Sequence, residues 1–149
     1  MYCQYKFKFY INASHAIYLN GKIGEIHPHT WEIILTAIKG RNDFVQFDKI
    51  ERMIEDYLQK YQDKTINYIK PFDITNPTLE NIALYLKGEM MKILLENGWL
   101  LTEIEVGETP ARSYIITLDT EFEQIAEASA EEFMDLNRAV EEKIQMVMK

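Results

Sequence analysis

The chain has 149 residues, of which 47% are hydrophobic and 27% are charged, the composition of an ordinary globular domain. Its formal net charge of -8 at pH 7 is offset by no cluster of lysine and arginine, which argues against nucleic acid as a partner. No apolar run reaches membrane length, the first residues lack a signal-peptide core, and Cys3 is the single cysteine. We therefore expect one cytoplasmic domain over residues 1–149, with no membrane partner.

The first part of the chain is predicted to form a β-hairpin. Residues 2–12 alternate aromatic and polar side chains, which is typical of a strand with one buried face, and residues 26–38 give a second strand. Between them, Asn20-Gly21 is the strongest short signal for a tight turn, because both residues tolerate positive φ. Pro28 lacks an N–H group and is therefore expected at a sheet edge or a bulge.

All three histidines of the chain lie in this hairpin. His27 and His29 are two residues apart, so in a strand their side chains point to the same face. If the hairpin pairs, it brings His15 to the same place. Three neutral imidazoles could then hold one metal ion and leave a fourth position open, as in catalytic zinc sites. The alternative is three unrelated surface or core histidines, but the turn between them favours the metal site.

Two helices are predicted next. The first covers residues 48–61, where Asp48 and Glu51 form a capping-box pattern ahead of an apolar stripe. After a polar loop, the second begins with Thr78 as its N-cap and ends at Asn97-Gly98.

The remaining chain predicts two strands, residues 99–106 and 111–118, joined by the short turn GETP, and then a third helix over about 120–147. The element order is ββααββα. It predicts an α+β domain in which a four-stranded antiparallel sheet carries helices on one face.

Six short segments resemble the 6-pyruvoyl-tetrahydropterin synthase and 6-carboxy-tetrahydropterin synthase family, whose members have the tunnelling fold. They are FYINASH at 9–15, HPHTW at 27–31 for the family's HGH, DFVQF at 43–47, Asn67 at the end of DHxxLN, PTLENIA at 77–83 for PTxENxA, and VGET at 106–109 for VxET. None is specific alone, but together they span about residues 7–118 in the right order. The resemblance implies a tunnelling-fold core at about 2–118, with an additional C-terminal helix that has no assigned counterpart.

The resemblance implies a zinc-dependent lyase that acts on dihydroneopterin triphosphate or a related pterin, in tetrahydropterin or queuosine biosynthesis. Family members hold Zn²⁺ with three histidines, which correspond to His15, His27 and His29, and the ion acts as a Lewis acid on the ligand. The VxET segment binds the pterin ring and corresponds to Glu108 and Thr109. A carboxylate can accept two neighbouring N–H groups, although without the resemblance Glu108 is better explained as a solvated turn residue.

The proton-transfer positions of the family are changed in this chain. The family's catalytic cysteine lies four or more residues before HGH, where this chain has Ile23, and its Asp-His pair is replaced by Gln62-Asp63. Two carboxylates are candidate replacements: Glu25, close to where some branches use a glutamate, and Asp63, in the place of the histidine. Glu25 is explained equally well as a surface carboxylate, whereas Asp63 is more simply explained as a loop residue that caps or solvates the end of the helix.

The resemblance also implies a homohexamer of two stacked trimers, with ligand pockets between subunits. A trimer or tetramer is the fallback if the additional helix blocks stacking. Two other functions stay open: a family enzyme with a shifted substrate, and a non-catalytic protein that binds a pterin or purine.

Overall fold

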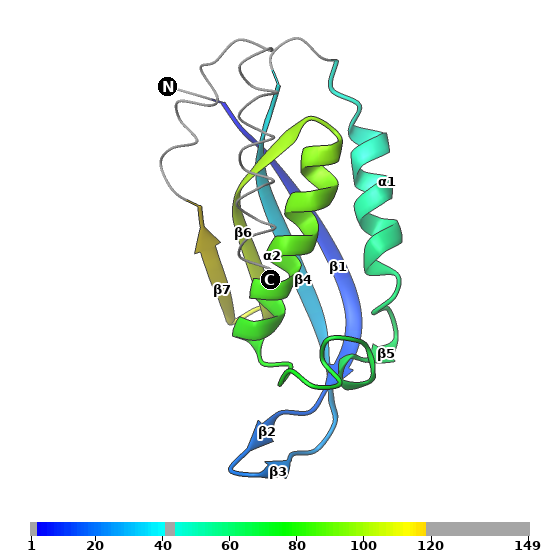
Figure 1. Cartoon of the computed structure of the whole chain (residues 1–149), viewed down its shortest axis with the longest axis vertical. Coiled ribbons are helices and arrows are strands. Elements are labelled where there is room, and N and C mark those ends of the chain that lie inside the picture. The colour runs from blue at the N-terminus through cyan, green and yellow to red at the C-terminus, as the bar shows by residue number, and fades with distance from the viewer. Residues whose placement is uncertain (1–2, 41–43, 119–149) are drawn as a thin grey trace.

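The computed structural model in Figure 1 describes residues 3–40 and 44–118. Its main sheet has the strand order β5-β1-β4-β6-β7. The four predicted strands are present and antiparallel: β1 (Tyr5–His15), β4 (His27–Lys39), β6 (Trp99–Thr109) and β7 (Arg112–Thr117). A fifth strand, β5 (Lys64–Thr65), adds to β1 in parallel. It was not predicted, because two residues are too few to show a strand period.

The first hairpin is longer than expected. β1 and β4 pair without interruption from Tyr5 opposite Ala37 to His15 opposite His27, so β1 continues three residues past its predicted end at residue 12. The connection forms a small hairpin of its own, β2 (Tyr18–Leu19) and β3 (Lys22–Ile23). Asn20 and Gly21 have φ values of 52° and 78°, so the predicted turn is confirmed.

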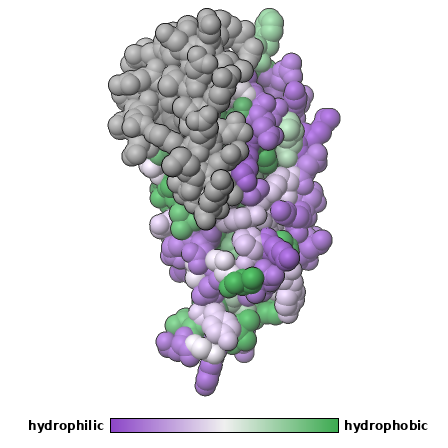
Figure 2. Space-filling view, in the orientation of Figure 1, coloured by the Kyte–Doolittle hydropathy of each residue, from purple (hydrophilic) through white to green (hydrophobic). Residues whose placement is uncertain are grey.

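The small hairpin projects beyond the end of the sheet (Figure 1). Figure 2 shows apolar side chains at this lower end of the molecule, where Tyr18, Leu19 and Ile23 are exposed.

Pro28 lies where the sheet tolerates it. β1 pairs with β4 from His27 to Ala37, whereas β6 pairs only with the part of β4 from Glu32 to Lys39. Pro28 therefore occupies a stretch of β4 with a hydrogen-bonded strand on one side only, which is the edge situation that was predicted.

Two helices cover one face of the sheet (Figure 1). α2 (Leu79–Glu96) begins as predicted, because the Thr78 Oγ1 accepts a hydrogen bond from the Asn81 backbone N–H at 3.1 Å. Its C-cap is Asn97, and Gly98 follows with a φ of 79°.

The predicted start of α1 was wrong. The helix runs over Phe47–Leu58 and its N-cap is Gln46, which makes no side-chain capping bond. Asp48 lies inside the first turn and so forms no capping box with Glu51; its charge can still interact favourably with the helix dipole. The chain leaves the helix before residue 61, although the Tyr61 side chain stays in the core.

The core fills the space between the sheet and both helices. Its largest fully buried side chains come from the sheet, the helices and the segment between the helices: Trp31, Ile33, Leu35, Ile50, Ile54, Leu58, Ile66, Met90, Leu94, Leu101 and Ile104. Burying each aliphatic side chain stabilises the fold by about 1.5–3 kcal/mol. Trp31 lies at one end of this core and contacts His15 and His29, so the core packs directly against the histidines of β1 and β4.

The second β-hairpin turns later than predicted, because β6 extends to Thr109 and leaves Pro110 and Ala111 to make the turn. The predicted third helix at about 120–147 lies outside the described residues. Within the described part of the chain, no helix has the length and hydropathy needed to cross a membrane.

Candidate metal centre

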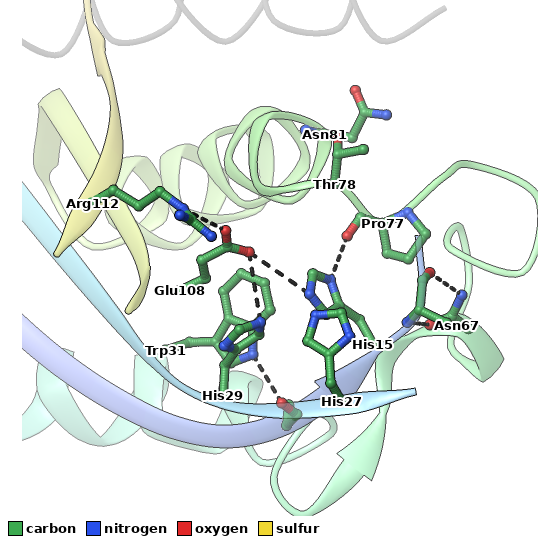
Figure 3. A network of polar contacts seen from close by, with 12 residues as sticks. His15, His27, His29, Trp31, Asn67, Pro77, Thr78, Asn81, Glu108 and Arg112 are labelled. Atoms are coloured by element: carbon green, nitrogen blue, oxygen red, sulfur yellow. Dashed lines mark hydrogen bonds and ion pairs between the residues drawn. The ribbon is translucent and has the colours of Figure 1, made fainter. Parts of the chain in front are cut away.

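The hairpin brings the three histidines together at one end of the sheet (Figure 3). His15 is the last residue of β1 and pairs directly with His27, the first residue of β4, while His29 pairs with Ala13. The ring centroids lie 4.5 Å apart for His15 and His27, 5.0 Å for His15 and His29, and 4.7 Å for His27 and His29. The alternation of side chains along the strands places all three on the face that carries the helices.

Backbone carbonyl groups orient two of the rings. The Nδ1 of His15 lies 2.8 Å from the Pro77 carbonyl oxygen, and the Nδ1 of His27 lies 3.0 Å from the Glu25 carbonyl oxygen. A carbonyl can only accept, so each Nδ1 carries the proton and donates it, leaving the Nε2 lone pair free. Histidines that bind metals are typically held in this way by a partner on the other ring nitrogen.

The electrostatic environment keeps His15 and His29 neutral. Burial lowers the pKa of His15 below its usual range; the hydrogen bond to Pro77 and the Glu108 carboxylate oppose this, and the other two histidines add to it. Burial also lowers the pKa of His29, against the effect of Glu108. Both rings are therefore in the neutral form that metal binding requires.

A metal ion fits this cluster. The Nε2 atoms of His15 and His29 are buried and have no hydrogen-bond partner among the described residues, an arrangement that costs about 1–3 kcal/mol for each group left unsatisfied. The ligand atoms of all three histidines lie within 4.8 Å of one another. Three imidazole nitrogens suit Zn²⁺ and other divalent ions of similar softness. The cluster could therefore hold one such ion.

Trp31 forms the floor of the centre. Its ring meets the rings of His15 and His29 edge-on, at centroid distances of 5.0 and 5.5 Å. Its indole N–H donates to the Ala13 carbonyl at 3.1 Å, which fixes the ring across β1 and β4. The tryptophan therefore restricts the rotation of two of the three histidine rings.

Two asparagines hold the chain that leaves His15. The Asn67 side chain accepts from the Ala16 N–H and donates to the Ala16 carbonyl, both at 2.8 Å. Asn76 makes the same pair of bonds to Tyr18, at 2.8 and 2.9 Å. Sequence reasoning used Asn67 only as the end of a motif and did not single out Asn76, so their roles were missed.

The segment around Pro77 joins the centre to α2. Its carbonyl holds His15, and Thr78 caps the helix, as described above. The Asn81 side chain reaches back and donates to the Asn76 carbonyl at 2.9 Å. The start of α2 and the His15 ring are therefore fixed by the same few residues, which gives the PTLENIA segment a physical role.

Glu108 lies beside the histidines and is only 12% exposed, so it is not a solvated turn residue. Its Oε1 accepts a hydrogen bond from the Arg112 Nε at 3.0 Å. Its Oε2 lies 3.7 Å from the His15 Nε2 and 3.8 Å from the His29 Nε2 (Figure 3). Arg112 belongs to none of the six family segments, and no signal in the sequence pointed to it.

A cavity of about 610 Å³ adjoins the centre, and His29, Glu108, Thr109 and Arg112 are among its lining residues. The Thr109 hydroxyl accepts from the Ala111 N–H at 3.2 Å and so stabilises the turn between β6 and β7. A small molecule in this cavity would lie beside both Glu108 and His29.

The two candidate acid-base residues are both exposed. Glu25 precedes β4, and its backbone carbonyl holds His27. Asp63 has a positive φ of 59°, and its N–H donates to the Asn12 carbonyl at 2.6 Å, next to β5. Within residues 3–40 and 44–118, no hydrogen bond or ion pair links either carboxylate to the three histidines.

Comparison with known proteins gave one family and a set of similar structures. The family model for 6-pyruvoyl tetrahydropterin synthase matches residues 4–119. A comparison with curated proteins found no match.

Three solved structures illustrate the likeness. The 6-pyruvoyl tetrahydropterin synthase of Caenorhabditis elegans has a TM-score of 0.65 at 12% identity and covers 78% of this chain and 96% of its own. That of Plasmodium falciparum has a TM-score of 0.57 at 17% identity and covers 76% and 96%. A Plasmodium vivax enzyme of the same name, described as a catalytic residue mutant with glutamate replaced by alanine, has a TM-score of 0.60 at 14% identity and covers 80% and 99%. At these identities the likeness establishes the fold.

Proposed function

Because the chain belongs to the 6-pyruvoyl tetrahydropterin synthase family and has its tunnelling fold, we propose that it is a zinc-dependent lyase acting on dihydroneopterin triphosphate or a related pterin. One observation carries the proposal: the neutral, buried and unpartnered Nε2 atoms of His15 and His29 face a common point beside His27. Among the described residues these two polar atoms have no hydrogen-bond partner, so a ligand for them is the simplest explanation.

His15, His27 and His29 would hold Zn²⁺, which when bound supplies Lewis-acid polarisation of an oxygen on the ligand. The chain's own contribution is to fix these ligands. Pro77 and Glu25 fix the tautomers of His15 and His27 through their carbonyl groups, and Trp31 limits the rotation of the rings.

Glu108 would orient the pterin ring. Its carboxylate is nearly buried and lies beside both the histidines and the cavity. A 2-amino-4-oxo pyrimidine edge offers two neighbouring N–H donors, which match the two oxygens of one carboxylate. Arg112 binds one of these oxygens from an exposed position, so a ligand can displace it at little cost. Thr109 would support the ring by holding the turn that follows Glu108.

Glu25 would move protons in place of the missing cysteine. Glu25 is two residues before His27 in the sequence, and its backbone carbonyl already orients the His27 ring. The relative from Plasmodium vivax, whose substituted glutamate is described as a catalytic residue, supports a glutamate in this role. Asp63 is the second candidate for this step.

A non-catalytic binder of pterins or purines is the second candidate function, and a family enzyme with a shifted substrate is a variant of the first. The binder is favoured by the positions of Glu25 and Asp63, because both side chains are exposed and neither is linked to the three histidines by a hydrogen bond or ion pair among the described residues.

The test measures conversion of dihydroneopterin triphosphate by the zinc-loaded protein, with the product identified by its mass and pterin binding measured in parallel. Glu25→Gln should lower turnover by about 10²–10⁴-fold and leave binding unchanged if Glu25 is the base. Asp63→Asn is compared in the same way, and Glu55→Gln, an exposed glutamate on α1, is the control. Pterin binding without turnover in the wild type would establish the binder, and turnover with a different product would establish the shifted substrate.

Assembly and location are further parts of this proposal. A homohexamer with pockets between subunits would cover the outer edge of β7 and the part of the β1 edge that β5 leaves unpaired, and exposed sheet edges favour such closure. Light scattering that reports a monomer at micromolar concentration would contradict it.

We place the reaction in the cytoplasm, where a single exposed Cys3 stays reduced.

A further inference from the structure

Glu108 faces the two buried histidines in a way that a ring-binding role does not require. Its Oε2 lies 3.7 and 3.8 Å from the Nε2 atoms of His15 and His29. These separations are too long for hydrogen bonds, so the carboxylate does not satisfy the nitrogens directly. Three atoms that carry lone pairs thus face one another, and in the part of the chain that the structure describes no group donates a hydrogen bond to either Nε2 (Figure 3).

These two distances are close to those between ligand atoms that bind the same metal ion. In a tetrahedral site with metal–ligand bonds of about 2.0–2.2 Å, neighbouring ligand atoms lie about 3.4 Å apart. The Oε2 of Glu108 is therefore within a few tenths of an ångström of the distance that a shared ion would impose on it. The ligand atoms of the three histidines lie within 4.8 Å of one another, and the Glu108 Oε2 lies closer than that to two of them, His15 and His29.

The charge and surroundings of Glu108 support the same conclusion. Three neutral imidazoles leave the two positive charges of a divalent ion uncompensated in a site where His15 is 1% exposed and His29 15%. A nearly buried carboxylate beside them compensates one of these charges. Its other oxygen is held by Arg112 at 3.0 Å, as the outer oxygen of a ligating carboxylate is usually held by a hydrogen bond.

We infer that Glu108 is the fourth ligand of the metal ion when no substrate is bound, so that the resting centre is a closed site of three histidines and one carboxylate. The inference rests on the proposed function for the metal site itself. It adds that the substrate must take over the position of Glu108 on the ion, which frees the carboxylate to bind the ring. Arg112 acts as a positioning residue, because it keeps the carboxylate turned toward the histidines.

The experiment uses Co²⁺ alone as the probe, because it replaces Zn²⁺ and its visible absorption reports the number and kind of its ligands. The full chain is stripped of metal and titrated with Co²⁺, and Glu108→Gln is compared with the wild type. We expect the variant to bind Co²⁺ at least about 10-fold more weakly and to give a changed absorption spectrum. Losing a residue that only hydrogen-bonds to a metal ligand costs about 10–100-fold in metal affinity, and losing a ligand itself should cost no less.

Two further variants separate the possible outcomes. Glu105→Gln removes a carboxylate from the opposite face of the same strand, where it accepts from Ser113, and should leave affinity and spectrum unchanged. His27→Ala should abolish tight binding. If His27→Ala loses the metal but Glu108→Gln keeps both affinity and spectrum, the inference that Glu108 is the fourth ligand is wrong, and the proposed histidine site stands. If His27→Ala binds as the wild type does, the histidine site fails, and this inference fails with it.

Discussion

Asn67 offers the sharpest test of how the fold positions the metal centre. Its side chain makes two hydrogen bonds, both 2.8 Å long, to the N–H and the carbonyl of Ala16, the residue directly after His15. Ala16 is fully buried, so water cannot easily replace the asparagine. Asn67→Ala removes both bonds and keeps the backbone unchanged.

The expected cost follows from the burial. A buried polar group left unsatisfied costs about 1–3 kcal/mol, and two such groups with partial relaxation give about 3 kcal/mol. For a chain of this length each kcal/mol shifts Tm by about 2–4 °C, so we expect a loss of about 6–12 °C. Because the end of β1 also carries His15, metal affinity should fall by about 10–100-fold, as for other groups that orient a ligand.

Asn76→Ala is the matched control. It removes the same two bonds, but from Tyr18, which is 55% exposed and whose backbone groups water can reach. We expect a loss of only about 1 kcal/mol and little change in metal affinity. Thermal unfolding of the metal-free proteins and titration with Zn²⁺ measure both effects. Equal losses for the two variants, or an unchanged Asn67→Ala, would refute the argument from burial.

Three other predictions concern stability. Burial raises the pKa of Tyr61 to about 12 and that of Tyr57 further, so the stability that these protonated hydroxyls contribute is complete below pH 10 and is lost as pH rises toward 12. Chemical unfolding between pH 8 and 11 should show this loss, and Tyr57→Phe should make it smaller. Thr78→Ala should cost about 1 kcal/mol through the lost cap on α2, measured by urea unfolding. Gly21→Ala should cost about 1–2 kcal/mol because its φ of 78° is unfavourable for alanine, whereas no atom within 4 Å would obstruct the added methyl group.

The features that sequence reasoning predicted correctly depend on neighbours in the chain. The Asn20-Gly21 turn follows from the φ values that two residues tolerate, and the common face of His27 and His29 follows from the strand period. The cap at Thr78 likewise needs only the residues of the first helical turn. These local rules were enough to bring all three histidines together.

The features that were missed depend on residues far apart in the chain. Asn67 bonds to a residue 51 positions away, and Asn76 to one 58 positions away, so no local pattern announces either pair. The two residues of β5 form a strand by pairing with Ala13 and Ser14 of β1, which lie about 50 positions earlier in the chain. The capping box at Asp48 failed because the N-cap of α1 is Gln46, two residues earlier than the pattern suggested, and the loop that leads into the helix has no periodic signal.

Glu108 shows what each source of inference contributes. By its local sequence it is a polar residue near a turn, and the family resemblance gave it a role at the pterin ring. Only the fold reveals that the same carboxylate lies between Arg112 and two unpartnered histidine nitrogens.

The central claim is that His15, His27 and His29 hold one zinc ion in each chain. The direct measurement is the zinc content of the purified protein, compared with that of His27→Ala and His29→Ala, with circular dichroism to show that the variants fold. We expect close to one zinc per chain in the wild type and almost none in either variant, because losing one of three nitrogen ligands leaves the others too weak to retain the ion. Equal zinc content in all three proteins would contradict the claim.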